Sequence, residues 1–162
     1  MLLGAAAADT SESHLVFLLD ESGSMAGSRW TALEAAFADF LKLRRRATVT
    51  ERVSVIQFSG TARSTYRNQP ITSDFVLRHG GGGTAFDCAF EEAIEAVAGS
   101  AASRTTLVFM TDGQDGSDPL PHVRTMKETA KSLTLFTVGV GQFDGAALEK
   151  ITRGANDGLL FK

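Results

Sequence analysis

Oxygen-bearing side chains occur in this sequence at spacings that suit a divalent metal ion. One carboxylate and two hydroxyls alternate in the motif Asp20-Glu21-Ser22-Gly23-Ser24. A second aspartate stands in Thr111-Asp112-Gly113, and a threonine follows a run of four glycines at residues 80–83. The candidate metal ligands are therefore Asp20, Ser22, Ser24, Thr84 and Asp112.

This all-oxygen set suits a hard cation. Mg²⁺ takes about six oxygen ligands at roughly 2.0–2.1 Å and usually keeps some of its water. Two carboxylates would neutralise the ion, and hydroxyls would complete its shell without adding charge. Mn²⁺ and Ca²⁺ accept the same ligands, whereas Zn²⁺ and copper favour imidazole and thiolate. Because the five side chains leave room for an outside ligand, we expect a partner protein to supply the carboxylate of an Asp or Glu.

Short apolar runs bounded by turn residues predict the strands that would position these ligands. Runs rich in Leu, Val, Phe and Thr predict strands buried on both faces at residues 14–19, 105–110 and 133–140. Residues 52–58 alternate between apolar and polar, which predicts a strand followed by an antiparallel edge partner at residues 61–67. A weak last run, Leu159–Phe161, predicts another edge strand.

Apolar residues at helical spacing predict helices between these strands. Asp118 before Pro119 predicts the N-cap and first position of a third helix, and Asp144 predicts the start of a short fourth. The apolar stripes of the first two helices are Trp30, Leu33, Phe37, Phe40 and Leu41, and Phe86, Ala89, Phe90, Ala93 and Val97.

The alternation of strands and helices predicts an α/β fold. We expect a Rossmann-like, doubly wound, mostly parallel sheet with one antiparallel edge strand and helices on both faces. Ligands bind such sheets outside the carboxyl ends of the strands. Asp20 and Asp112 each follow a predicted strand, and Thr84 lies at a predicted helix start. The coincidence of all five residues at such ends favours a metal site.

Composition and charge exclude several function classes. The chain has 162 residues, which suits one domain, and its net charge of −3 supplies no positive field to attract nucleic acid. No apolar run reaches the roughly 20 residues of a membrane-spanning helix, so membrane insertion is not expected. The single cysteine, Cys88, excludes an internal disulfide and any multi-cysteine metal site. We expect a monomer.

The motifs resemble those of the von Willebrand factor type A domains, which carry a metal-ion-dependent adhesion site. The pattern Asp-x-Ser-x-Ser is present as Asp20, Ser22 and Ser24, the distant threonine as Thr84, and the last aspartate as Asp112. Residues 53–59 and 136–141 look like the family's second and fifth strands. The resemblance implies direct ligation by the two serines and the threonine, with the aspartates often acting through water. It also implies metal-dependent binding of an acidic partner residue.

The resemblance covers residues 14–161. We expect residues 1–12 to form a loose N-terminal segment and residues 13–162 to form one domain. Members of the family usually continue into a C-terminal helix, which moves on partner binding where affinity is switchable. This sequence ends at Lys162 without such a helix, so we expect a fragment or a trimmed domain without that switch. The lack of disulfides and of a signal peptide favours the cell interior, although a fragment would have lost its signal.

Two other functions stay open. A haloacid-dehalogenase-like phosphotransferase would use Asp20 as nucleophile, Ser59 as phosphate contact, and Asp112 with Asp115 as metal ligands. That family needs a second aspartate two residues after the nucleophile, where this sequence has Ser22. The other alternative is a metal-free structural module. We expect a protein-binding domain without enzymatic activity.

Each candidate ligand also has a structural alternative. Thr84 would cap its helix, with Asp87 three residues later completing a capping box. Ser22, Ser24 and Asp112 would be turn residues.

Overall fold

A computed structural model describes residues 12–47, 50–113 and 115–155, together with the backbone of residues 159–161. The predicted loose segment at residues 1–12 lies outside the described residues except for Glu12. No helix in the described ranges has both the length and the apolar character needed to span a bilayer.

Six strands of the described chain form one sheet in the order β3-β2-β1-β4-β5-β6. All neighbouring strands are parallel except β2 and β3, which are antiparallel. The predicted α/β fold is therefore confirmed, including its antiparallel edge. The strands are β1 (Ser13–Asp20), β2 (Glu51–Phe58), β3 (Ala62–Pro70), β4 (Arg104–Thr111), β5 (Leu133–Gly139) and β6 (Leu159–Phe161).

The central strand β1 is buried along its whole length, because helices cover both faces of the sheet. Its Val16 and Leu18 belong to the apolar cluster on one face, and its Phe17 belongs to the cluster on the other. This two-sided burial explains why the sequence of β1 is nearly continuous in apolar residues.

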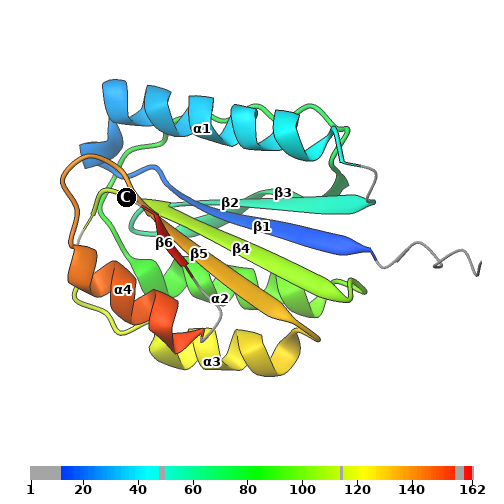
Figure 1. Cartoon of the computed structure of the whole chain (residues 1–162). Coiled ribbons are helices and arrows are strands. Elements are labelled where there is room, and N and C mark those ends of the chain that lie inside the picture. Colours follow the sequence, from blue (N-terminus) through cyan, green and yellow to red (C-terminus); the bar gives the residue numbers. More distant parts are fainter. Residues whose placement is uncertain (1–11, 48–49, 114, 156–158, 162) are drawn as a thin grey trace, which may run out of the picture.

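In the described ranges, four α-helices pack on the sheet, and all four were predicted. Helix α1 (Ser28–Arg44) covers one face, and α2 (Phe86–Ala98), α3 (Leu120–Thr129) and α4 (Gly145–Gly154) cover the other (Figure 1). A short 3₁₀ helix, η1 (Gly23–Met25), connects β1 to α1.

The starts of the last two helices were predicted with unequal success. Asp144 caps α4 as expected, since its carboxylate accepts hydrogen bonds from the backbone N–H groups of Ala146 and Ala147. Pro119, and not Asp118, occupies the cap position of α3. The prediction of Asp118 as N-cap is therefore wrong by one residue.

The strand order reverses beside β1. From β1 the chain builds outward through β2 and β3, and it then returns to add β4, β5 and β6 on the other side of β1. In open α/β sheets, the crevice at such a reversal binds ligands outside the carboxyl ends of the strands. The C-terminal ends of β1 and β4 are at this point, and they carry Asp20 and Thr111.

Candidate metal centre

Asp20 is fixed at the end of β1. It is fully buried, and both of its carboxylate oxygens accept hydrogen bonds. The backbone N–H of Ser22 donates to Oδ1 at 2.8 Å, and the hydroxyl of Thr111 donates to Oδ2 at 2.5 Å. The loop after β1 and the end of β4 are therefore joined through this one carboxylate.

A chain of hydrogen bonds continues from the loop to the second aspartate. The hydroxyl oxygens of Ser22 and Ser24 lie 3.0 Å apart, and the hydroxyl of Ser24 donates to Oδ1 of Asp112 at 2.8 Å. Ser22 is buried, whereas Ser24 is exposed. The structure thus brings four of the five predicted ligands together, with an opening to solvent at Ser24.

Thr84, the fifth predicted ligand, lies beside the same carboxylates. A Cβ atom built on Gly113 would be 3.1 Å from Cγ2 of Thr84 and 3.4 Å from Oδ2 of Asp20. Gly113 follows Asp112 directly, so Thr84 borders the loop that carries the second aspartate. Among the described residues, its hydroxyl has no hydrogen-bond partner.

The alternative role of Thr84 as a helix cap is wrong. Helix α2 begins at Phe86 with Ala85 in the cap position, and no side chain of that cap residue bonds the helix. The backbone N–H of Phe86 instead donates to Oδ2 of Asp115 at 2.6 Å. The hydroxyl of Thr84 is therefore left available for a ligand.

The glycine run before Thr84 is held against the loop after β1. The N–H of Gly81 donates to the carbonyl of Glu21, and the N–H of Gly23 donates to the carbonyl of Gly82, both at 2.9 Å. Gly81 and Gly82 have φ angles of 78° and 112°, which side chains rarely tolerate. The glycines therefore allow a backbone conformation that other residues would strain to adopt, and this conformation positions Thr84.

Two neighbouring carboxylates, Asp20 and Asp112, favour the binding of a cation at this site. Burial raises the pKa of the Asp20 carboxyl, and the negative charge of Asp112 acts in the same direction. Hydrogen bonds from Thr111 and Ser22 oppose this shift without cancelling it. Two buried carboxylates joined by hydroxyls fit a hard divalent ion, which would relieve their repulsion.

The donor set consists of oxygen atoms only. The described part of the chain has no group of three or more His, Cys, Asp and Glu side chains placed to hold a metal. A site here would rest on two carboxylates and three hydroxyls, which is the composition predicted from the sequence.

Arg29, in the first turn of α1, was missed by the sequence analysis. Its Nη1 forms an ion pair with Oδ2 of Asp112 and donates to the carbonyl of Ser24 at 3.1 Å. Arg29 and Asp112 are 83 residues apart in sequence, so no local pattern indicates the contact. The positively charged guanidinium of Arg29 therefore contacts one of the proposed metal ligands.

Further contacts that the sequence did not predict support the loop after β1. Glu21 is buried and forms an ion pair with Arg63 of β3, and Gln57 of β2 donates to its Oε2 at 2.8 Å. Nε2 of His79 lies 2.9 Å from the carbonyl oxygen of Ser22. Only the position of Glu21 inside the motif could have drawn attention to this support.

Asp115 does not join the candidate centre. Partial burial alone would raise the pKa of its carboxyl, but hydrogen bonds from Ser117 and from the N–H of Phe86 lower it. The residue thus serves as a cap for α2. The phosphotransferase alternative would use Asp112 and Asp115 together, but among the described residues the side chain of Asp112 contacts Ser24 and Arg29, and that of Asp115 contacts Phe86 and Ser117.

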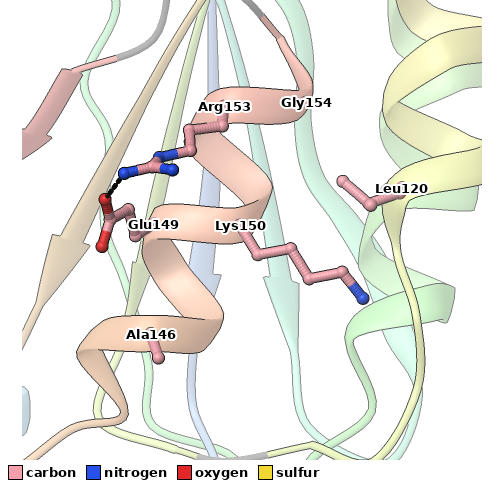
Figure 2. Close-up of a pocket in the computed structure, with 6 residues that line it drawn as sticks. All are labelled: Leu120, Ala146, Glu149, Lys150, Arg153 and Gly154. Atoms are coloured by element: carbon pink, nitrogen blue, oxygen red, sulfur yellow. Dashed lines mark hydrogen bonds and ion pairs between the residues drawn. The ribbon is translucent and has the colours of Figure 1, made fainter.

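A surface pocket of about 440 Å³ lies away from these residues, between α3 and α4 (Figure 2). Glu149 and Arg153 form an ion pair along one turn of α4 at its wall. None of the five candidate ligands borders it, so the pocket is not part of the metal centre. Its lining residues are Leu120, Ala146, Glu149, Lys150, Arg153 and Gly154.

Comparison with known proteins agrees with the motifs. The sequence profile of the von Willebrand factor type A domain matches residues 14–162. No curated protein matches the sequence of the chain.

Several solved structures share the fold. An aerotolerance-related membrane protein from Bacteroides fragilis, solved with multiple mutations to serines, has a TM-score of 0.69 and 18% identity over 93% of this chain and 90% of its own. Proximal thread matrix protein 1 from the mussel byssus, with zinc in its MIDAS motif, has a TM-score of 0.70 and 16% identity over 93% of this chain and 41% of its own. The PilB minor pilin from Streptococcus sanguinis has a TM-score of 0.71 and 12% identity over 97% and 58%.

At these identities the structural matches establish a common fold alone. The chain also spans less than two thirds of the mussel and streptococcal proteins.

Proposed function

The chain belongs to the von Willebrand factor type A domain family, and from this premise we propose that it is a protein-binding module that depends on a divalent cation. Membership of the family supports a protein-interaction module in general. The specific proposal is that Asp20, Ser22, Ser24, Thr84 and Asp112 hold Mg²⁺ and that an Asp or Glu of a partner protein completes the shell.

The observation that carries this proposal is the continuous hydrogen-bonded connection from Asp20 through Ser22 and Ser24 to Asp112. It lies at the reversal of strand order, where α/β sheets bind ligands. The hydroxyls of Ser22, Ser24 and Thr84 would bind the ion directly, and the two carboxylates would balance its charge. When bound, the ion would supply positive charge and an open position for an outside carboxylate.

We propose no catalytic role for the same residues. Both oxygens of Asp20 accept hydrogen bonds, which stabilise the carboxylate and lower its nucleophilicity. Ser22 stands where a phosphotransferase would need its acid and base. These two features favour binding over phosphoryl transfer.

Calorimetric titration of metal-stripped protein tests the proposal. Wild type should bind one Mg²⁺ or Mn²⁺ saturably, and Asp20→Ala should abolish binding because it removes a buried ligand. Ca²⁺ and Zn²⁺ belong in the same series, since the mussel protein carries zinc at its motif. Asp118→Asn is the matched control: Asp118 is an exposed aspartate that pairs with Lys150 and contacts none of the five ligands among the described residues, so the variant should bind metal as wild type does.

The absence of saturable binding by folded wild-type protein, with every metal tested, would contradict the proposal. Equal binding by wild type and Asp20→Ala would show that the metal binds elsewhere in the molecule.

A further inference from the structure

The guanidinium of Arg29 lies among three loops at the carboxyl edge of the sheet. It pairs with Asp112 after β4 and donates to the carbonyl of Ser24 after β1. On the side of β5, a Cβ atom built on Gly141 would be 2.9 Å from Nε of Arg29. Gly141 has a φ angle of 71° and no side chain, so the backbone of this loop leaves room for the arginine.

The two members of this ion pair differ in their access to solvent. The side chain of Asp112 is 0% exposed, whereas that of Arg29 is 39% exposed. A buried carboxylate without a counterion is costly, but a half-exposed arginine can move into water with little loss. Asp112 therefore depends on a nearby cation more than Arg29 depends on Asp112.

Both oxygens of Asp112 are engaged in this arrangement. Oδ1 accepts from Ser24, and Oδ2 is paired with Arg29. Asp20 and Asp112 together carry two negative charges, and the guanidinium cancels one of them. A divalent ion that approaches Asp112 would meet a second positive charge on the same carboxylate.

We infer that Arg29 is an internal counterion that competes with the divalent cation for Asp112 and thereby weakens metal binding. The inference rests on the proposed function and names a residue that sets the affinity of the same site. In the metal-free protein Arg29 stabilises Asp112. Metal binding would require the arginine to give up Oδ2, and the free energy of separating the pair would lower the apparent affinity.

The affinity of metal-stripped protein for Mn²⁺ tests this role. Arg29→Gln should lower the Kd for Mn²⁺ by about threefold to fivefold, the upper end of what the loss of one half-exposed charge pair is worth. Arg29→Lys keeps the charge and should stay close to wild type. Arg78→Gln is the control for long-range charge, because Arg78 is an exposed arginine next to His79, which contacts Ser22, and it has no ion pair among the described residues. Its Kd should change by less than about twofold.

A second measurement separates competition from damage to the fold. In metal-free protein, Arg29→Gln should have a lower Tm than wild type, because Asp112 loses its counterion. At saturating Mn²⁺ the rise in Tm should be larger in Arg29→Gln than in wild type. A variant that was only misfolded would show weaker binding and a smaller rise.

The outcomes distinguish this inference from the function on which it rests. Saturable binding by wild type with equal or weaker binding by folded Arg29→Gln would overturn the role of Arg29 alone. Absence of binding by both proteins would overturn the metal site as well. Binding by Arg29→Gln but not by wild type would support a counterion strong enough to close the site.

Discussion

Asp20 occupies an environment that opposes its own charge. Burial raises the pKa of its carboxyl, Asp112 adds to the shift, and the hydrogen bonds from Thr111 and Ser22 offset it only in part. A carboxylate of this kind destabilises the free protein unless a positive charge lies near. The residue is therefore better explained by ligand binding than by stability of the fold.

His14, by contrast, is a buried titratable residue at the other end of β1. Its Nε2 lies 2.8 Å from the hydroxyl of Ser54, and its buried Nδ1 has no hydrogen-bond partner within the described part of the chain. Burial, followed by the positive charge of Arg52, lowers its pKa from 6.5 to about 4. The folded protein therefore favours the neutral form of the His14 side chain.

This shift predicts a loss of stability in mild acid. Between pH 6.5 and about pH 4 the unfolded chain takes up a proton at His14 that the folded protein excludes, so the free energy of unfolding falls as the pH falls. From pH 7 to pH 5 the contribution of His14 should be about 1 to 2 kcal/mol. His14→Gln should reduce the fall by that amount in urea unfolding experiments at the two pH values.

His122→Gln is the control for this comparison. His122 lies in the first turn of α3 beside Asp87 and is partly exposed, so its loss should leave most of the pH dependence in place. A wild-type fall in stability that persists in His14→Gln would show that other groups cause it.

At the residue scale, the sequence predicted the ligands whose arrangement shows in short motifs, but not the contacts between distant residues. The alternation of Asp20, Ser22 and Ser24 is visible in five consecutive positions, and the structure brings these residues together with Asp112. Thr111 and Arg29 contact the aspartates across 91 and 83 residues of sequence. Such contacts depend on the strand order, which spacing in one sequence does not determine.

At the scale of elements, the glycine run before α2 determines where Thr84 lies. Gly82 combines a φ angle of 112° with contact to Ser59, whose Oγ would be 3.1 Å from an added Cβ atom. Gly82→Ala should destabilise the protein by about 1 to 3 kcal/mol, the usual cost of a strained backbone. It should also weaken Mn²⁺ binding by about tenfold, since the displaced loop carries Thr84, and titration with Mn²⁺ measures this loss.

Gly83→Ala offers a matched comparison one residue away. Its added Cβ atom would meet nothing within 4 Å, and its φ angle lies outside the left-handed region. Stability should therefore change by less than about 0.5 kcal/mol, with metal affinity unchanged. Equal effects of the two substitutions would show that loop flexibility, and not the backbone path, matters.

The elements themselves were predictable where burial is strongest. β1 and β4 follow from continuous apolar runs, and α1 and α2 follow from apolar periodicity, whereas α3 and α4 were predicted from residues at their starts. The edge strand β3 was predicted at residues 61–67 but runs Ala62–Pro70, because irregular pairing with β2 continues as far as Pro70 opposite Arg52. An edge strand has few buried side chains, so its hydrophobic pattern does not define the residues at which the strand begins and ends.

At the scale of the whole molecule, the layers follow from the alternation of strands and helices, but the reversal of strand order beside β1 does not. Each crossover could have placed its strand on either side of the growing sheet. The observed order brings the loops after β1 and β4 together, and the loop of Thr84 packs against them. The site therefore belongs to the topology as much as to the motif.

This long-range assembly has a kinetic consequence. Thr111 and Asp20 are 91 residues apart, and they meet only after β1 and β4 have paired. Because a contact of such high sequence separation forms only after a large loop has closed, we expect the ligands to come together after the transition state of folding. A bound ion would stabilise the native state without stabilising the transition state.

Saturating Mg²⁺ should accordingly slow unfolding and leave the refolding rate unchanged, as stopped-flow measurements in urea can determine. Asp20→Ala should show neither effect. Faster refolding with Mg²⁺ would instead place the assembled site in the transition state. On this account the ion extends the lifetime of the folded domain and does not hasten its formation.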